Sequence, residues 1–358
     1  MKTWQKLKNN PALWSRYLLR ERVIKKIRSF FDERGFHEVE TPMLIRHPPA
    51  ESYLDVFETV LLDRHRNPTK AYLSTSPEVA LKKLMVAGMG NCYSLTKSFR
   101  NTEAGDRLHN PEFTILEWYR VGATYTDIMK ECEDLILHLL NTISFDHDKA
   151  KPCRQGLALN SQTLSYRDNY INLAPPWERI SVKEAFQKYA RVDLEEFSTI
   201  QNARRIAVSM GYSVANENAW EELYNQIFLN EVEPHLGINR PTILYDFPVA
   251  VAALAKKKES DPRFAERFEL YIGGLELGDC YTELTDWKEQ KTRFDKEMKE
   301  IQRLGKTSYD YDHDFIEALR VGLPECSGIA VGVDRLIMLL TDSVNVADVL
   351  LFPIEELL

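Results

Sequence analysis

The chain has few cysteines and no long apolar run, and these two absences narrow its class first. Its five cysteines show no CxxC spacing, so neither a disulfide framework nor a zinc site is expected, and a reducing compartment fits. The N-terminal stretch MKTWQKLKNN lacks the apolar segment of a signal peptide. No apolar run approaches the roughly 18 residues that a membrane span needs. We therefore expect a cytoplasmic protein without a membrane partner.

Glycine-rich phosphate loops are also missing. The chain contains no GxGxxG and no P-loop sequence, so those nucleotide-binding frameworks have no support. Its net charge of −8 argues against broad affinity for nucleic acid, although a local basic patch can sit on an acidic protein. With 358 residues, of which 44% are hydrophobic and 28% charged, the chain is typical of a globular protein with a sizeable core.

The sequence does contain a series of helices and mostly antiparallel strands. Apolar spacing predicts a helix over residues 13–34, which Gly35 ends. A second helix is expected after Ser76 and Pro77, at its N-cap and first position. Regular βαβ units are absent, so the order favours an α+β fold with helices packed on an antiparallel sheet.

A predicted hairpin carries the first candidate site. Residues 92–100 and 113–119 alternate in polarity, as two antiparallel strands do. Arg100 and Phe113 lie on its two strands. A guanidinium group recognises phosphate in a bidentate way, and an aromatic ring is a stacking platform for a base. A strand phenylalanine is more often part of the core, so the pair alone leaves both interpretations open.

Two carboxylates in GLELGDCYTELTD form the second candidate. Glu276 and Glu283 are seven residues apart, which places them on opposite faces of a regular strand. A bulge or bend near Gly278 would bring them together. Converging carboxylates suit magnesium bound to a nucleoside triphosphate. Solvated glutamates on an edge strand are the simpler interpretation of the spacing alone.

Two helix starts add further candidates. In GIAVGVDRLIMLL, glycines let the backbone approach a ligand, and Arg335 can reach a phosphate. Alternatively, Asp334 is a helix cap or a first-turn acid and Arg335 a surface charge. Ser76 and Glu78 stand at a helix N-terminus, where an acid is favourable for the helix dipole alone. Each candidate is ambiguous by itself, whereas their joint order is specific.

Taken in order, ERGFHEVETPML, FRNTEAGDRLHNPEFTILEWYR, ELGDCYTELTD and GIAVGVDRLIMLLT resemble the three signature motifs of class II aminoacyl-tRNA synthetases. HNPEFT and ELTD resemble the lysyl-tRNA synthetase branch in particular. The resemblance covers about residues 16–353. It implies a six- to seven-stranded antiparallel sheet flanked by helices, a homodimer formed through the first motif, and ATP and Mg²⁺ as cofactors.

The resemblance also implies a domain organisation. About 15 residues precede the helix of the first motif, which is too short for a five-stranded anticodon-reading barrel. We therefore expect a short extension over residues 1–15, a catalytic domain over residues 16–358 and no anticodon-binding domain. Residues 191–240, helical and polar in character, are the best candidate for an insertion. The chain thus resembles a truncated branch of the family, which ligates (R)-β-lysine to elongation factor P.

The resemblance assigns a nucleotide site. Arg100 would bind the α-phosphate, Phe113 would stack on adenine, and Arg335 would hold the γ-phosphate end. Arg100, Arg335 and Glu276 would be the catalytic residues, and Glu276 and Glu283 the magnesium ligands. The residues implied around ATP are Arg100, Asn101, Thr102, Glu103, His109, Asn110, Phe113, Glu276, Leu277, Gly332 and Arg335.

It also assigns an amino-acid site. Glu78 and Ser76 would meet the amino group of a lysine-like substrate. Tyr119 and Glu283 would receive its ε-ammonium group, which stays protonated near neutral pH. The residues implied around this substrate are Ser76, Pro77, Glu78, Tyr119, Asp279, Glu283 and Ala330. LEWYR is typical of the truncated branch, and Ala330 stands where the tRNA enzymes usually have glycine, a change thought to reshape the pocket for a β-amino acid.

Three positions depart from the family pattern. Thr102 holds a position where the tRNA enzymes usually have glutamate, and Glu103 follows it. Cys280 replaces a glycine. Asp279 replaces an asparagine expected to help position the carboxylate or amino group of the substrate. We hypothesise that the charge of Asp279 favours a displaced amino group, as in a β-amino acid.

The implied reaction begins with attack of the amino-acid carboxylate on the α-phosphorus of ATP, which needs no base because the carboxylate is already ionised. A lysine amine of elongation factor P then attacks the adenylate, and it must first lose a proton. The sequence offers no assured base for that step. Three alternatives stay open: a tRNA-aminoacylating enzyme, which the missing barrel and the net acidity disfavour, a catalytically silent binding protein, and a ligase acting on a small molecule.

Overall fold

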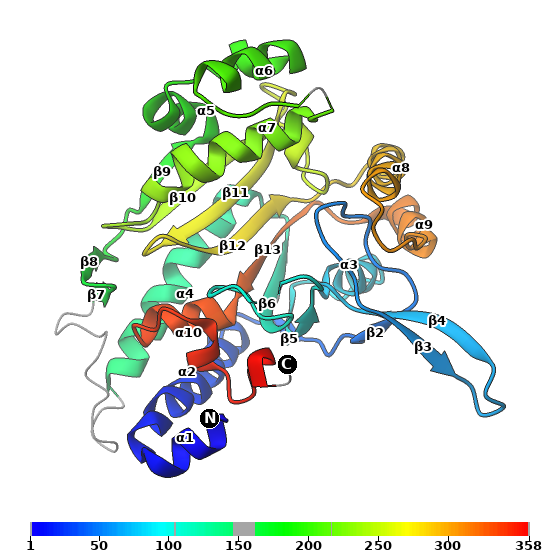
Figure 1. Cartoon of the computed structure of the whole chain (residues 1–358). Coiled ribbons are helices and arrows are strands. Elements are labelled where there is room, and N and C mark those ends of the chain that lie inside the picture. The colour runs from blue at the N-terminus through cyan, green and yellow to red at the C-terminus, as the bar shows by residue number, and fades with distance from the viewer. Residues whose placement is uncertain (1, 104, 146–161, 216, 357–358) are drawn as a thin grey trace.

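The computed structural model describes residues 2–103, 105–145, 162–215 and 217–356 (Figure 1). Its main sheet has eight strands in the order β1-β5-β6-β13-β12-β11-β10-β9. In that order they are His37–Glu38, Cys92–Phe99, Glu112–Val121, Cys326–Gly332, Leu275–Thr282, Phe264–Ile272, Thr242–Pro248 and Glu178–Ser181. The inner pairings are antiparallel, whereas β1 pairs with β5, and β9 with β10, in parallel. The α+β prediction is confirmed, and the sheet is wider than expected because a parallel strand is added at each edge.

Helices α2 (Trp14–Asp32), α4 (Tyr125–Phe145) and α10 (Val333–Leu340) cover one face of this sheet (Figure 1). Along α2 the buried residues include Val23, Ile27 and Phe30, which recur at helical spacing and meet the strands in the main core. Gly35, with φ of +71°, takes the left-handed conformation just after the helix end. The predicted helix over residues 13–34 is therefore confirmed.

Helices α3 (Glu78–Val86), α8 (Trp287–Arg303) and α9 (His313–Gly322) build a separate core on the other side. Adjacent β5 residues show the division, because Cys92 belongs to this core and Tyr93 to the main one. The expected N-cap role of Ser76 is wrong. The N-cap of α3 is Pro77, and the Ser76 carbonyl instead accepts a hydrogen bond from Ser74 Oγ at 2.7 Å.

A third core joins helices α5 (Val182–Ala185), α6 (Ile200–Ser209) and α7 (Trp220–Ile227) to strands β10 and β11. Stacked rings form its centre: Phe186 and Tyr224 lie 5.0 Å apart between ring centroids, and Tyr224 and Phe228 lie 6.0 Å apart. The helical character predicted for residues 191–240 is confirmed in α6 and α7. Ala203 and Ala207 of α6 and Tyr224 of α7 are buried in this core, so the segment is part of the body of the protein.

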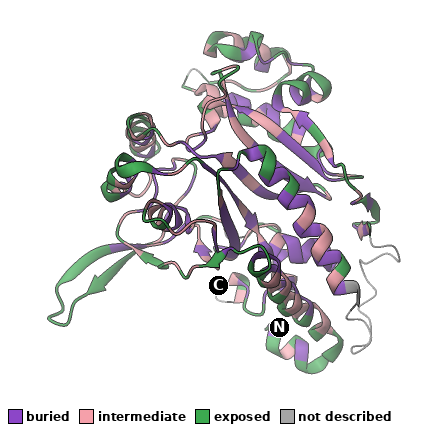
Figure 2. Cartoon of the chain, turned by 180° about the vertical axis from the view of Figure 1, so that it is seen from behind, coloured by how far each residue is buried: buried purple, intermediate pink, exposed green. Residues whose placement is uncertain are grey.

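Two small sheets stand outside the main one. Strands β2 (Leu44–Ile45), β3 (Glu58–Leu62) and β4 (Pro68–Leu73) form the first, and the β3–β4 hairpin projects from the body with mostly exposed residues (Figures 1 and 2). Strands β7 (Thr163–Tyr166) and β8 (Asn169–Asn172) form the second.

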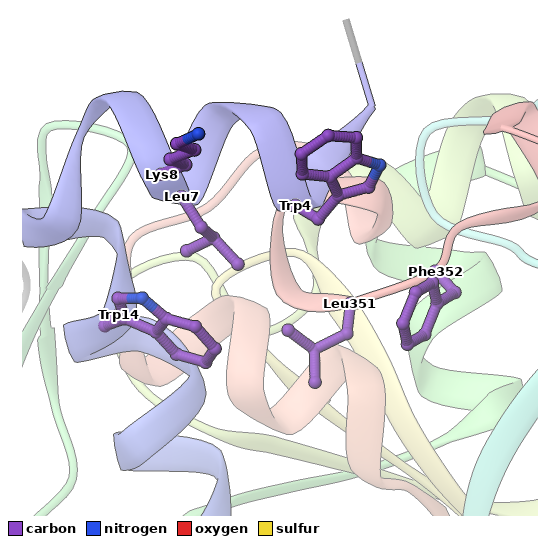
Figure 3. Close-up of a pocket in the computed structure, with 6 residues that line it drawn as sticks. All are labelled: Trp4, Leu7, Lys8, Trp14, Leu351 and Phe352. Carbon is purple, nitrogen blue, oxygen red and sulfur yellow. The ribbon is translucent and has the colours of Figure 1, made fainter.

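Helix α1 (Thr3–Asn9) borders an apolar hollow with a volume of about 290 Å³ (Figure 3). Its lining comes from α1, the start of α2 and the C-terminal segment: Trp4, Leu7, Lys8, Trp14, Leu351 and Phe352. A neighbouring hollow of about 410 Å³ follows the outer side of α2. Neither hollow contains a residue of the predicted nucleotide or amino-acid site.

Among the described residues, Cys92, Cys132, Cys280 and Cys326 are free and buried, while Cys153 lies outside them. Within the same residues, no helix combines the length and the apolarity that crossing a membrane requires.

Candidate active site

The register of the main sheet places polar side chains in a row across it. It aligns Ser94 with Glu117, Glu117 with Ala330, Ala330 with Asp279, and Asp279 with Glu269. Aligned residues of neighbouring strands share a face. Ala330, in the middle of the row, adds only a methyl group between two acids. The surface that this row of side chains forms, the floor of the site, is therefore lowest at Ala330.

A second row runs beside the first. It aligns Tyr119 with Gly328 and Gly328 with Tyr281. A Cβ atom on Gly328 would lie 2.3 Å from the Tyr119 ring, so this ring position requires glycine on the neighbouring strand. Gly328 therefore allows the Tyr119 ring to lie against the sheet.

A bulge in β12 turns its acids to one side. The pairing with β11 skips Leu277, which is the extra residue of the bulge. Leu277 and Cys280 both belong to the core although they are three residues apart. Glu276 and Asp279 therefore share the opposite face. Of the two interpretations left open for this stretch, the bulge is confirmed, and the edge strand is wrong because β12 lies between β13 and β11. Since the Leu277 side chain is in the core, only its backbone is left to face a nucleotide.

An acidic pocket lies between α3 and the second row. Glu78 and Glu283 both bond the ammonium group of Lys82, with 2.5 Å between Glu283 Oε2 and Lys82 Nζ. Tyr119 donates its hydroxyl hydrogen to Glu117 Oε1 at 2.5 Å, and its ring centroid lies 5.8 Å from Lys82 Nζ. The side chains of Lys82 and Glu283 are only 3% and 1% exposed. Three carboxyl groups therefore surround one ammonium group in a space nearly closed to water.

The acids of this acidic pocket outnumber its cation. Burial disfavours the charge of Lys82, but Glu283 and Glu78 outweigh burial and raise the pKa of Lys82. Burial first, and then the charge of Glu78, raises the pKa of Glu117 well above its usual range. Because one cation faces three acids, an added ammonium group would be stabilised here.

Several buried polar atoms around the pocket have no hydrogen-bonding partner among the described residues. They are Thr75 Oγ1, Ser94 Oγ, Arg100 Nε, Glu117 Oε2 and Glu283 Oε1. Buried polar atoms in folded proteins nearly always have a partner, so this group of atoms marks a place where polar groups of a ligand fit.

Arg100 and Phe113 meet at the other end of the site. The guanidinium carbon of Arg100 lies 5.2 Å from the centroid of the half-buried Phe113 ring. Burial opposes the charge of Arg100, but Tyr53, Glu51 and other nearby acids outweigh burial and raise its pKa. The two residues predicted to clamp the nucleotide are therefore brought together, with the arginine charged.

Arg335 reaches the same side of the site from α10. It donates to the Glu276 carbonyl at 2.7 Å and bonds His109 Nε2 at 2.6 Å. Because arginine only donates, His109 Nε2 accepts, and His109 Nδ1 carries the proton that it donates to Asp106 at 2.7 Å. The side chain of Arg335 is 20% exposed, which excludes a simple surface charge. Asp334 is not the N-cap of α10, which is Gly332, but it is an acid of the first turn as the alternative had it, and it accepts from the Thr114 N–H at 2.7 Å.

Asn101, Thr102 and Glu103 form the turn after Arg100. Thr102 has φ of +65°, a strained conformation for a β-branched residue, and its hydroxyl donates to the Asn101 carbonyl at 2.6 Å. Glu103 is half-buried and contributes to the raised pKa of Arg100. Thr102, which differs from the family pattern, is therefore exposed, while Glu103 is close enough to influence the pKa of Arg100.

Asn110 and Gly332 border the nucleotide side. Asn110 is buried, and its amide donates to the Glu112 carbonyl at 2.6 Å and accepts from the Ile354 N–H at 3.0 Å. These bonds fix the C-terminal segment to the hairpin. Gly332 precedes α10, and a Cβ atom there would only touch the Arg335 side chain at 3.9 Å.

Asp279 is not an unpaired charge. Its two oxygens accept from Arg267 Nε at 2.8 Å and Nη2 at 3.0 Å, and Tyr281 donates to it at 2.6 Å. Arg267 also donates to Glu269 at 2.7 Å. The hypothesis that Asp279 favours a displaced amino group stays a prediction, although a bidentate arginine already offsets the charge of this carboxylate.

The two expected magnesium ligands, Glu276 and Glu283, have different neighbours. Glu283 is bonded to Lys82, whereas Glu276 lies near Glu269 on the neighbouring strand. Burial, helped by the charge of Glu276 and opposed by Arg267, raises the pKa of Glu269 to about 8. Mg²⁺ at nucleotide sites usually takes one or two carboxylates and completes its shell with phosphates and water. Glu276 and Glu269 fit that pattern, while the described residues hold no cluster of three metal-binding side chains.

Sequence reasoning missed Lys82, Glu117, Arg267 and Glu269. Two of them had a local signal: Lys82 is four residues after Glu78 on a helix, and Glu117 shares a strand face with Tyr119. The other two had none. Their contact with Asp279 depends on the register between β11 and β12, which the spacing within one strand does not determine.

The site lies on a mostly antiparallel sheet, with acidic side chains at one end and arginines at the other. This arrangement fits the synthetase catalytic domain that the motifs predict. The chain belongs to the class II aminoacyl-tRNA synthetases: a family model described as tRNA synthetases class II (D, K and N) matches residues 2–356. The family resemblance seen in the motifs is therefore confirmed.

The relatives carry two different names. The elongation factor P–(R)-beta-lysine ligases of Proteus mirabilis and Hamiltonella defensa are 37% and 36% identical to this chain, with 94% and 96% of both chains covered, respectively. The lysine–tRNA ligase of Moorella thermoacetica is 36% identical over 96% of this chain. This chain spans 66% of that ligase, just under two thirds of its length. Identity alone therefore does not distinguish between the two named activities.

Proposed function

We propose that this chain is an ATP-dependent ligase that activates a lysine-like amino acid as an adenylate and transfers it to a lysine side chain of elongation factor P. The observation that carries the proposal is the buried acidic pocket at the opposite end of the site from Arg100 and Phe113, in which one ammonium group faces three carboxyl groups. Two relatives matched over nearly their whole length are named for this reaction.

The amino acid binds in the acidic pocket. Its side-chain ammonium group bonds Glu283 Oε1, which has no hydrogen-bonding partner among the described residues, and approaches the Tyr119 hydroxyl. Its second amino group bonds Glu78 beside Ser76. Two positive groups on one substrate match the excess of acids, which selects a diamino acid over an amino acid with an apolar side chain.

Activation joins the two ends of the site. The substrate carboxylate attacks the α-phosphorus of ATP, an acyl–phosphate bond forms, and pyrophosphate leaves with the electrons of the broken P–O bond. Arg100 neutralises charge on the α-phosphate, Arg335 holds the far end of the triphosphate, and Phe113 stacks on the base. The residues act by positioning and by charge, which is how most of the barrier to such a transfer is lowered.

Glu276 and Glu269 would hold a magnesium ion against the triphosphate. The ion would supply positive charge to the phosphate oxygens. Glu283 stays with Lys82 and the amino acid.

Ala330 supports (R)-β-lysine as the substrate, in preference to the α-amino acid lysine. It aligns with Glu117 on one side and Asp279 on the other, so its methyl group sets the height of the floor between two acids. A β-amino acid has one more carbon between its amino group and its carboxylate than an α-amino acid. With the amino group held in place, the carboxylate therefore moves relative to this floor.

We also propose that two copies associate through α2 and the hollow in Figure 3. Trp14 and Leu18 on α2 are 45% and 48% exposed, and Trp4 and Phe352 at the hollow are 58% and 75% exposed. Large apolar side chains gathered on one face are typical of a protein interface. Sedimentation analysis of the wild type and of Trp14→Glu tests this, and a wild-type monomer at micromolar concentration contradicts it.

The test of the main proposal is ATP–pyrophosphate exchange with lysine, both β-lysine enantiomers and ornithine. Exchange should be fastest with (R)-β-lysine, and a mass increase of elongation factor P should follow when that protein is added. Exchange with none of the four contradicts the proposal and supports a catalytically silent protein.

A second candidate function, aminoacylation of tRNA, is favoured by the lysine–tRNA ligase relatives. Charging of total tRNA with lysine distinguishes the two. Robust lysyl-tRNA formation without modification of elongation factor P replaces our proposal with this one, and neither product despite exchange points to a small-molecule acceptor.

A further inference from the structure

Glu51, in the loop between β2 and β3, is a buried carboxyl group near Arg100 that neither proposed substrate uses. The residue is 8% exposed, and its Oε1 accepts a hydrogen bond from the Tyr53 hydroxyl at 2.7 Å. Tyr53 itself is 65% exposed. The two side chains therefore form a hydrogen-bonded connection between the surface and the interior.

The loop that carries Glu51 is held in place on both sides. Tyr309 donates to the Pro49 carbonyl at 3.0 Å, and the Ser52 N–H donates to Glu297 on α8 at 2.9 Å. Both bonds are made by backbone groups of the loop, so neither occupies the carboxyl group of Glu51. A fixed backbone gives this carboxyl group a defined position, which a group that transfers protons needs.

The loop that carries Glu51 lies against both ends of the proposed site: the Asn101 N–H, next to Arg100, donates to the Asp55 carbonyl at 2.8 Å, and Ala50 packs in one core with Leu81 of α3. The charged groups of the site that influence it are Glu78 and Arg100. In the proposed function Arg100 holds the α-phosphate and Glu78 an amino group of the substrate, so these two residues lie on either side of the acyl–phosphate junction. A nucleophile that approaches the acyl carbon from the Tyr53 side passes Glu51.

We propose that Glu51 is the general base of the transfer step, an inference that rests on the proposed function. The Glu51 carboxylate takes one proton from the ε-ammonium group of the acceptor lysine. The freed amine forms a C–N bond with the acyl carbon, and the bond from that carbon to the phosphate oxygen breaks, leaving its electron pair on AMP. The second proton of the nitrogen passes to the phosphate of AMP, so the atoms and charges balance.

The surroundings of Glu51 suit this role. Burial, followed by the charge of Glu78, raises the pKa of Glu51 to about 7, while Tyr53 and Arg100 lower it. A general base is most effective when its pKa lies near the working pH, because it can then accept a proton and release it again. The titratable and charged groups that face it come from its loop, α3, the residue after β5, α8 and the segment after α8: Tyr53, Glu78, Arg100, Glu297 and Tyr309.

The test compares two nucleophiles on preformed adenylate bound to the enzyme. The first is a lysine amine, presented by elongation factor P or by Nα-acetyllysine amide, which must lose a proton before it attacks. The second is hydroxylamine, which is already uncharged near pH 7. In Glu51→Gln, the ratio of amine transfer to hydroxamate formation should fall by about 10²-fold, the usual contribution of a general base.

Glu297→Gln is the matched control, because it removes a carboxylate that contacts the same loop outside the predicted substrate site. Its ratio should fall far less than that of Glu51→Gln, because the charge of Glu297 is the smallest of the influences on Glu51. An unchanged ratio in Glu51→Gln, with adenylate still formed, overturns the role of Glu51 alone. If the wild type forms no adenylate with any lysine-like amino acid, the proposed function fails and this inference fails with it.

Tyr53→Phe gives an independent readout that keeps Glu51 in place. The hydroxyl of Tyr53 lowers the pKa of Glu51, so its removal should raise that pKa further. The transfer rate of the wild type should rise with pH through about 7 as Glu51 loses its proton, and the midpoint should move to higher pH in Tyr53→Phe. A midpoint that stays in place or moves to lower pH overturns the proposal.

Discussion

The amino-acid pocket and the nucleotide side of the candidate active site hold their charges in different environments. In the pocket, Lys82 and Glu283 have side chains that are 3% and 1% exposed, and they are bonded to each other. On the nucleotide side, Arg335 and Glu276 have side chains that are 20% and 37% exposed and lie 3.5 Å apart. The first pair is almost fully buried in the absence of substrate, while the second is accessible to water and to a phosphate.

This difference predicts where a substitution has its effect. A buried charge that loses its partner has no water to replace it, so the folded state itself is destabilised. A partly exposed charge that loses its partner is solvated and costs little stability. Substitutions in the pocket should therefore change stability as well as activity, whereas those on the nucleotide side should act mainly on activity.

The largest expected effect tests the sealed pocket. Lys82→Met leaves Glu78 and Glu283 without their cation and should lower the free energy of unfolding by about 3–5 kcal/mol, measured by urea denaturation. The neighbouring Lys83 is the matched control. Its side chain is 28% exposed and pairs with Asp312 and Asp314, so Lys83→Met should cost less than about 1 kcal/mol. Equal losses would contradict the comparison.

The second prediction concerns the nucleotide side. Arg100→Ala should slow ATP–pyrophosphate exchange by about 10²–10³-fold, because a preorganised positive charge on the α-phosphate is lost. Its loss of stability should be smaller than that of Lys82→Met. Arg64→Ala, an exposed arginine in the β3–β4 turn, is the control and should exchange at the wild-type rate. A similar rate in both variants would remove Arg100 from the reaction.

The third prediction separates the two halves. Ala330→Val adds two methyl groups to the lowest part of the floor, and misfit of this size changes kcat/KM by about 10- to 200-fold. The loss should appear for the amino acid, while KM for ATP stays near its wild-type value. An equal change for both substrates would mean that the halves are not independent.

The smallest effect is expected at Asp279. Because Arg267 already neutralises its carboxylate, Asp279→Asn should change the preference between lysine and (R)-β-lysine by less than about tenfold, or about 1.4 kcal/mol. The measurement is pyrophosphate exchange with each amino acid. A larger change would restore a direct role for the charge of Asp279 in substrate choice.

Much of the site was predictable because its motifs are local. The hairpin from β5 to β6 follows from alternation around a polar loop, and it brings Arg100 to Phe113 as expected. The bulge in β12 was only one of two interpretations, because the odd spacing of Glu276 and Glu283 also fits an edge strand, and the pairing with β11 decided for the bulge. Ser76 was misjudged because Pro77, not the serine, is the last residue before the helix.

By itself, the sequence determined the order of the motifs, the α+β class, the family, and the faces on which most candidate side chains lie. Only the tertiary structure decided which charges meet: Lys82 between Glu78 and Glu283, and Arg267 on Asp279. The physical reason is that the period of a helix or strand fixes a face locally. The partners of a buried charge, and therefore its pKa, depend on the register between strands and on the packing of α3 over the sheet.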